Sequence, residues 1–250
     1  MWVVRREEIH LTSRELGRGG WAVVQVAEFR GLTVAAKCLH HAIISPYNRH
    51  LFVREMKIAS SLRHPNLVQF IGATTEGQTI ILTELMHTSL RATLERGPLN
   101  AAQITSISID VARALNYLHL MHPDPILHRD ISSTNVLLNP LPSNGWRAKV
   151  SDYASFSYLQ HLKTAGPGNP TYAAPEANVP KLQSPKVDVF SYGVLLLEMW
   201  SQRLPDVKER AACLHRVQQQ AFKTLIQYCL EHQPEMRPNM YQVLEHFERH

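Results

Sequence analysis

The chain has 250 residues, 44% apolar and 19% charged, which is an ordinary globular composition for one large domain or two lobes. Residues 1–4 run directly into the charged residues 5–8, and the most apolar stretch, 194–197, is far shorter than the ~20 residues of a bilayer span, so we expect neither signal peptide nor membrane helix. The net charge is +5, but basic residues are scattered among acidic ones, which argues against nucleic acid as a partner.

Three cysteines cannot form a disulfide framework, and they indicate a reducing compartment, so we expect a cytoplasmic location. Cys213 with His215 and Cys229 with His232 loosely resemble zinc-ligand spacing. Neither pair lies in a turn-rich segment, so the favoured interpretation is two helices with buried thiols and exposed histidines.

The first third of the chain is typical of a β-rich structure. Short apolar or β-branched runs at residues 23–26 and 32–36, separated by Gly31, predict two strands. Residues 67–71 and 79–83 predict two more.

One helix is expected within this β-rich part. Ser45 and Pro46 offer a cap and a first-turn proline, and apolar residues at helical spacing follow over 51–62. Pro65 ends the pattern, because it disfavours helical geometry in the residue before it.

After residue 86 the pattern becomes helical. Residues 104–118 predict a long helix, and residues 187–200 predict one that is apolar nearly all round and therefore buried. Strand-like pieces and the turn pair at 144–145 lie between them. Residues 211–250 are expected to be helical with one break at 234–238.

We therefore expect an α+β fold and a single domain over residues 1–250. Its small β-rich lobe would span residues 1–83, its hinge 84–88 and its larger, mostly helical lobe 89–250. A ligand would be expected in the cleft between two such lobes.

Two features of the β-rich part indicate phosphate binding. Residues 17–20 hold three glycines between two predicted strands, where backbone N–H groups can approach phosphate oxygens, although a plain turn explains them equally well. Lys37 closes a strand, and Glu55 on the next helix can pair with it. A paired lysine is held rigid and can bind phosphate as a point charge.

The run at residues 128–138 carries the strongest signal. Asp130 can accept a proton from a substrate hydroxyl, and Asn135 can ligate a metal through its amide oxygen. Asp152 offers a second oxygen ligand of the kind that Mg²⁺ prefers. Residues 168–176 then precede the buried helix that bears Asp188, and this order and spacing are not expected by chance.

From about residue 9 to residue 246 the sequence resembles a eukaryotic protein kinase domain. Its motifs are similar to those of the tyrosine-kinase-like group of serine/threonine kinases. The resemblance implies a bilobal fold, a protein substrate, and ATP with Mg²⁺, or Mn²⁺, as cofactors. It implies that Asp130 is the catalytic base, that Lys37 and Glu55 form an ion pair, and that Asn135 and Asp152 hold the metal. The residues that it assigns to ATP are Leu16, Gly17, Gly19, Val24, Ala35, Lys37, Thr83, Glu84, Met86 and Leu137.

The same resemblance implies two structural roles. Glu176 and Arg237 would form an ion pair that ties the end of the activation segment to the helical lobe. Asp188 would brace the catalytic loop.

Several positions depart from the family's pattern. Ala22 replaces a third glycine, and Ala154 replaces the glycine of the metal-binding triplet. Ser132 and Thr134 stand where serine/threonine kinases carry Lys and tyrosine kinases carry Arg, so a cation that would stabilise the transferring group is missing. Tyr172 favours serine/threonine specificity. The main expectation is an active serine/threonine kinase, with a pseudokinase scaffold and a tyrosine or dual-specificity kinase as alternatives.

Overall fold

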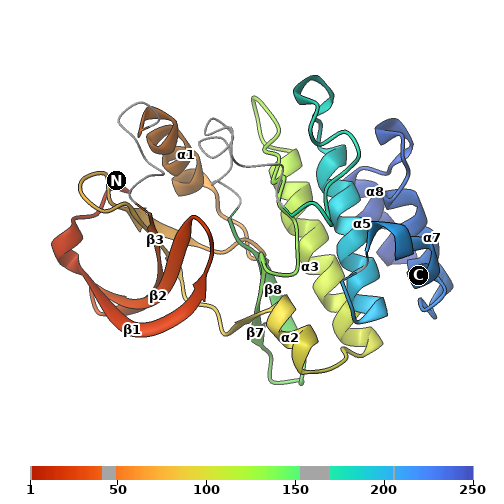
Figure 1. Cartoon of the computed structure of the whole chain (residues 1–250), viewed down its shortest axis with the longest axis horizontal. Coiled ribbons are helices and arrows are strands. Elements are labelled where there is room, and N and C mark those ends of the chain that lie inside the picture. Colours follow the sequence, from red (N-terminus) through yellow and green to blue (C-terminus); the bar gives the residue numbers. More distant parts are fainter. Residues whose placement is uncertain (1, 41–48, 153–168, 205, 250) are drawn as a thin grey trace. The chain divides into compact units, whose positions relative to one another are not determined.

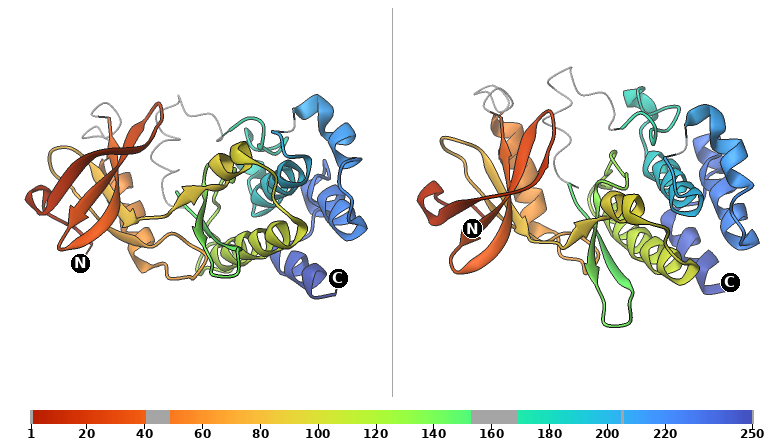
Figure 2. Two further views of the ribbon diagram at one scale, coloured as in Figure 1. Left: turned by 90° about the horizontal axis from the view of Figure 1, so that it is seen from below. Right: turned by 60° about the horizontal axis from the view of Figure 1, so that its bottom comes forward.

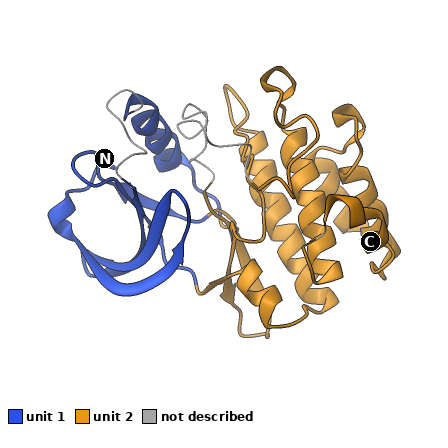
Figure 3. Ribbon diagram, viewed as in Figure 1, with its two compact units in different colours: residues 1–64, 68–86, 154–165 blue, residues 65–67, 87–153, 166–250 orange. Residues whose placement is uncertain are grey.

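The structure is a computed structural model that describes residues 2–40, 49–152, 169–204 and 206–249. The described chain forms two compact units, coloured separately in Figure 3. Unit 1 contains the described residues up to His64 together with Val68–Met86. Unit 2 contains Pro65–Leu67 and the described residues from His87 onward. The single domain with lobes at 1–83 and 89–250 about a hinge stays a prediction.

Unit 1 is built on a five-stranded antiparallel sheet of order β1-β2-β3-β5-β4. Arg30 and Gly31, with φ of 49° and 80°, form the tight turn between its second and third strands, as the sequence indicates at Gly31. Each of the four predicted strands has a counterpart, although the one predicted at 67–71 begins only at Phe70. The elements are η1 (Arg6–Glu8), β1 (Ile9–Arg18), β2 (Ala22–Phe29), β3 (Leu32–Leu39), α1 (Arg49–Ser61), β4 (Phe70–Ala73) and β5 (Ile80–Glu84).

The strand register gives this sheet two different faces. Val24 pairs with Lys37, and Ala35 pairs with Thr83, so these four side chains share one face, because direct partners in an antiparallel ladder point the same way. The alternate residues of the same strands build an apolar core on the other face. Its buried members are Val4, Ile9, Ala27, Phe29, Val34, Ala36, Cys38, Ile80 and Leu82.

Unit 2 is mainly helical, with α3 and α5 side by side at its centre (Figures 1 and 2). Asn100 caps α3 in a reciprocal capping box with Gln103. The helix α5 is buried on nearly all sides, as predicted. The elements are β6 (Thr88–Ser89), α2 (Leu90–Arg96), α3 (Ala101–His119), β7 (Val136–Pro140), β8 (Trp146–Val150), η2 (Pro180–Leu182), α5 (Lys186–Ser201), η3 (Val207–Glu209), α6 (Arg210–Leu214), α7 (Gln220–Cys229), η4 (Pro234–Met236) and α8 (Met240–Arg249).

The C-terminal stretch differs from its prediction. Besides the expected break at 234–238, the helix is interrupted between α6, which ends at Leu214, and α7, which begins at Gln220. Val217 is buried within this interruption. The five residues concerned include neither Gly nor Pro, so no local helix breaker marks the interruption. Ser45 and Pro46, the expected cap of the first long helix, lie outside the described residues.

The cysteines behave as buried thiols. Cys213 lies on α6 and Cys229 on α7, and both are fully buried. Burial raises the pKa of Cys229 to about 12. Within the described ranges, no group of three or more His, Cys, Asp or Glu side chains is arranged to hold a metal. None of the described helices has the length and apolar character needed to cross a membrane.

Candidate active site

The catalytic-loop candidates Asp130 and Asn135 lie together in unit 2. The side-chain amide of Asn135 donates one hydrogen bond to the carbonyl oxygen of Asp130 and one to its Oδ2, each of 2.8 Å. This arrangement leaves Oδ1 of Asn135 as the remaining acceptor of that side chain. The other carboxylate oxygen of Asp130 accepts the backbone N–H of Asn169 at 3.1 Å. Both carboxylate oxygens of Asp130 are therefore held by amide donors.

The backbone of the loop is fixed by Asp188, as expected. The carboxylate of Asp188, fully buried on α5, accepts the N–H groups of His128 at 2.8 Å and Arg129 at 2.7 Å. The ring of His119 makes a further 2.9 Å contact with it. Burial alone would raise the pKa of Asp188, but His119 and these donors outweigh it and hold the pKa below its usual value. The bracing lets Arg129 keep its left-handed φ of 64°.

The ring of His128 connects the loop to the residue that precedes Asp152. One ring nitrogen lies 2.7 Å from the carbonyl oxygen of Ser151, and the other accepts the N–H of Asp130 at 3.2 Å. Ser151 in turn donates its N–H to the carbonyl oxygen of Asn135 at 2.8 Å. Asp152 follows with φ of 59°, a strained value for a residue with a side chain. These bonds gather Asp130, Asn135 and Asp152 in one place.

The electrostatics of Asp130 suit a proton acceptor. Burial raises the pKa of its carboxyl, and the negative charge of Asp152 adds to the increase. The hydrogen bonds from Asn169 and Asn135 act in the opposite direction, and the net direction is upward. A raised pKa brings the carboxylate closer to the working range of a general base at neutral pH.

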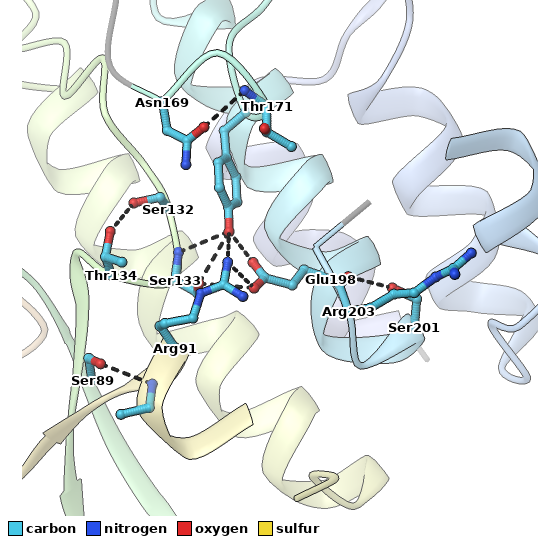
Figure 4. Close-up of polar contacts among 12 residues, drawn as sticks. Ser89, Arg91, Ser132, Ser133, Thr134, Asn169, Thr171, Glu198, Ser201 and Arg203 are labelled. Carbon is cyan, nitrogen blue, oxygen red and sulfur yellow. Dashed lines mark hydrogen bonds and ion pairs between the residues drawn. The ribbon is translucent and has the colours of Figure 1, made fainter. Parts of the chain in front are cut away.

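The two positions that lack the usual cations contact each other. The hydroxyl groups of Ser132 and Thr134 lie 2.8 Å apart (Figure 4). Ser132 is buried and Thr134 is exposed. Tyr153 and Ala154, the rest of the metal-binding triplet, lie outside the described residues.

In unit 1, the glycine-rich segment forms the hairpin between β1 and β2. Gly17 pairs with Val24, and the N–H of Gly19 donates to the carbonyl oxygen of Ala22 at 2.9 Å. A Cβ atom added at Gly17 or Gly20 would meet no described atom within 4 Å, and one at Gly19 would meet only the Ala22 oxygen at 4.0 Å. None of the three has a left-handed φ. The fold itself does not require glycine here, so the open backbone fits a group that approaches it closely.

The remaining nucleotide candidates of unit 1 occupy two places. Val24, Ala35, Lys37 and Thr83 share the sheet face opposite the apolar core, and all are half-buried. Glu55 is buried on α1, and its pairing with Lys37 stays a prediction. The other candidates lie at strand ends or beyond them. They are Leu16 and Gly17 near the end of β1, Gly19 just after it, Glu84 at the end of β5, and Met86, buried, two residues further.

Glu84 is held from both sides by Gln69. Its N–H donates to the carbonyl oxygen of Gln69 at 2.9 Å, and its Oε1 accepts the N–H of Gln69 at 2.6 Å. Leu137 is the one adenine-binding candidate in unit 2. It is half-buried on β7, where it pairs with Lys149 and Ser89.

The sequence did not indicate two groups of residues beside the loop. Asn169 bonds Asp130 through its backbone N–H, a group that nearly every residue type has, so the sequence does not indicate it. The half-buried Arg91 and the buried Ser133 and Glu198 form a polar cluster with Tyr172, and the only signal for it was a glutamate beside the apolar run of α5. The predicted pair of Arg237 and Glu176 is confirmed, with Nη1 and Oε1 2.6 Å apart.

Comparison with known proteins agrees with this arrangement. Residues 11–247 match the family described as "Protein kinase domain". A probable serine/threonine-protein kinase of Dictyostelium discoideum is 32% identical over 246 residues, 92% of this chain and 23% of the relative. Serine/threonine-protein kinase 12 of Arabidopsis thaliana is 31% identical over 94% of this chain and 55% of the relative. The dual specificity protein kinase shkD of Dictyostelium discoideum is 30% identical over 95% of this chain and 34% of the relative.

The chain thus spans between 23% and 55% of the length of these three relatives. The family match covers nearly the whole chain, and it includes the loop that holds Asp130 and Asn135 as well as the strand that bears Lys37. The chain belongs to the protein kinase family.

Proposed function

We propose that this chain transfers the γ-phosphoryl group of MgATP to serine or threonine hydroxyls of protein substrates. The observation that carries the proposal is the arrangement of Asp130, Asn135 and Asp152, in which a half-buried carboxylate is held by amide donors beside two candidate metal ligands. Bound MgATP would supply the phosphoryl group and the positive charge that offsets its negative oxygens.

Each of the three residues has a separate task in this proposal. Asp130 accepts the proton of the attacking hydroxyl and orients it. Asn135 keeps Asp130 in place through its N–H groups and offers Oδ1 to a divalent cation. Asp152 offers a carboxylate to the same class of cation, with Mn²⁺ as an alternative to Mg²⁺.

The nucleotide contacts are proposed for unit 1. The open backbone at Gly17 and Gly19 receives phosphate oxygens, and Lys37, oriented by Glu55, binds phosphate as a point charge. The apolar neighbours of Lys37 on the same sheet face, Val24 and Ala35, would contact the adenine ring. The remaining contacts are assigned to Leu16, Thr83, Glu84, Met86 and Leu137.

The proposed hydroxyl specificity is for serine and threonine. Tyr172 supports it, and so do the names of two of the relatives described above. The dual specificity relative is the reason to test tyrosine directly. Because Ser132 and Thr134 bring hydroxyls in place of a cation, we expect slow transfer.

The test is incubation of the protein with labelled MgATP and a generic protein substrate. Wild type should label the substrate, Asp130→Asn should not, and Asp124→Asn, a change at an exposed carboxylate, should behave as wild type. Acid hydrolysis of the product identifies the labelled hydroxyl. Labelling by neither wild type nor Asp124→Asn would reject the proposal.

The second candidate function is a pseudokinase scaffold. The pair of Ser132 and Thr134 favours this candidate, because neither residue supplies the positive charge that would stabilise the transferring phosphoryl group. Nucleotide-induced thermal stabilisation, with and without Mg²⁺, separates the candidates. A scaffold that binds nucleotide would be stabilised without labelling substrate, whereas a purely protein-binding scaffold would show neither effect.

A further inference from the structure

A buried carboxylate in unit 2 gathers side chains from separate parts of the chain. Glu198 is fully buried on α5, and its Oε1 forms an ion pair with Arg91 Nη2 at 2.8 Å and accepts a hydrogen bond from Ser133 Oγ at 3.0 Å (Figure 4). The hydroxyl of Tyr172 donates to the other oxygen, Oε2. We call Arg91, Ser133, Tyr172 and Glu198 the Glu198 cluster.

Ser133 is bound at all of its polar groups. Its Oγ lies 3.2 Å from the hydroxyl oxygen of Tyr172, in addition to its bond to Glu198. Its carbonyl oxygen accepts the N–H of Arg91 at 2.9 Å, and its own N–H lies 3.5 Å from the Tyr172 hydroxyl. The residue has no exposed surface, so water cannot replace a bond that is lost.

The position of Ser133 in the chain connects these bonds to the proposed catalytic residues. It lies three residues after Asp130 and two before Asn135, the two residues to which chemistry is assigned. Asn169 donates its N–H to Asp130, and Tyr172, three residues later, contacts Ser133. The loop and the segment 169–172 are therefore joined at two points, one at the carboxylate of Asp130 and one at the Glu198 cluster.

We propose that Ser133 is a positioning residue, whose buried hydroxyl holds Asp130 and Asn135 in the observed arrangement. It acts through Glu198 and Tyr172. The inference rests on the proposed function, because that function gives Asp130 and Asn135 their roles. A cluster that only stabilised unit 2 would affect the unfolding temperature and leave turnover unchanged while the protein is folded.

The direct test is Ser133→Ala with Ser108→Ala as its matched control. Ser108 is also fully buried in unit 2, but its hydroxyl donates to the backbone oxygen of Ile104 at 2.7 Å within α3. Ser133→Ala should lower kcat about ten-fold or more, because small displacements of reacting groups are costly, and should change the KM for ATP less than about two-fold. Ser108→Ala should leave both constants near those of wild type at a temperature where every variant is folded.

A second pair of variants tests the route through Tyr172. Tyr172→Phe keeps the ring and removes the hydroxyl, and its matched control is Tyr192→Phe, a fully buried tyrosine whose hydroxyl binds Ser108 O at 3.0 Å. If Ser133 acts through Tyr172, the double variant Ser133→Ala/Tyr172→Phe should lose no more kcat than the more impaired single variant. The Tyr192→Phe variant should keep kcat near wild type.

Amide hydrogen exchange of residues 128–135 provides a readout that does not depend on turnover. Ser133→Ala should accelerate exchange in this loop, and Ser108→Ala should not. A kcat for Ser133→Ala within about two-fold of that for Ser108→Ala would overturn the inference, as would unchanged loop exchange. If wild type transfers no phosphoryl group, the proposed function fails by itself, and the exchange comparison still decides whether Ser133 positions the loop.

Discussion

Arg237 holds Glu176 with a two-point ion pair: Nη1 lies 2.6 Å from Oε1, and Nη2 lies 3.0 Å from Oε2. Both side chains are buried, and the guanidinium of Arg237 also lies 4.9 Å from the ring centre of Phe190. Its remaining N–H groups donate to backbone oxygens, so the charge is fully compensated within unit 2. Arg237 thus anchors the chain at Glu176, the end of the activation segment.

We therefore predict that Arg237→Ala lowers the free energy of unfolding by about 3–5 kcal/mol, because it leaves the buried Glu176 charge uncompensated. Urea unfolding at neutral pH measures the change. The control is Arg249→Ala, which removes an exposed partner of Glu245 at 3.5 Å and should cost less than about 1 kcal/mol. Equal costs for the two substitutions would contradict the prediction.

The second prediction concerns Asn135→Asp. The substitution replaces two N–H donors to Asp130 with a carboxylate oxygen, so like charges face each other and the orientation of Asp130 is lost. We expect kcat to fall about a hundred-fold or more, with steady-state assays in MgATP and MnATP as the measurement. Asn139→Asp, near the opposite end of β7 where its Oδ1 accepts the backbone N–H of His87, is the control and should retain most activity. A variant at 135 that kept wild-type kcat would show that this amide is dispensable.

The third prediction compares two glycines of unit 1. A Cβ at Gly19 meets nothing closer than 4.0 Å, whereas one at Gly72 would lie 2.6 Å from Val4 Cγ1 and 2.8 Å from the carbonyl oxygen of Trp2. Gly19→Ala should therefore change the unfolding free energy by less than about 1 kcal/mol but weaken nucleotide binding. Gly72→Ala should cost about 1–3 kcal/mol through overpacking. Calorimetric titration with nucleotide and urea unfolding test both variants, and unaltered nucleotide affinity in Gly19→Ala would count against phosphate binding at this loop.

The fourth prediction concerns pH. Burial raises the pKa of Glu198 above its ordinary value of 4.5, although Tyr172 and Arg91 oppose the increase. The folded protein therefore binds more protons than the unfolded chain between 4.5 and the raised value, so this group's contribution to stability falls as pH increases through that window. Glu198→Gln removes the titration, so the stability difference between variant and wild type should shift in favour of the variant as pH rises. Urea unfolding of both proteins at several pH values measures this stability difference. A shift in favour of wild type as pH rises would contradict a raised pKa for Glu198.

The parts of this protein that sequence predicts well are those where a local pattern carries the information. The apolar run that becomes α5 and the short apolar and β-branched run that becomes β3 are examples, because the length and residue types of each run indicate its structure. Asp130, Asn135 and Asp152 could be proposed as site residues because their spacing along the chain is itself the signal.

What sequence could not supply depends on contacts between distant residues. The N–H of Asn169 bonds Asp130 across 39 positions, and any residue with an N–H group could do the same. Ser133 bonds Glu198 across 65 positions, so the sequence around Ser133 does not indicate its role. The interruption before α7, where Val217 is buried, likewise has no local Gly or Pro to mark it.

The two faces of the five-stranded sheet have a consequence for how this chain can change during evolution. Lys37 and Ala35 lie on one face while Ala36 and Cys38 lie in the apolar core, and the hydrogen-bond register of β3 alone separates them. Inserting or deleting one residue within β3 would turn Lys37 toward the core and the apolar residues outward. We therefore expect insertions and deletions within β3 to be selected against as strongly as substitution of Lys37. A change in the length of the turn at Arg30 and Gly31 would not turn Lys37 toward the core.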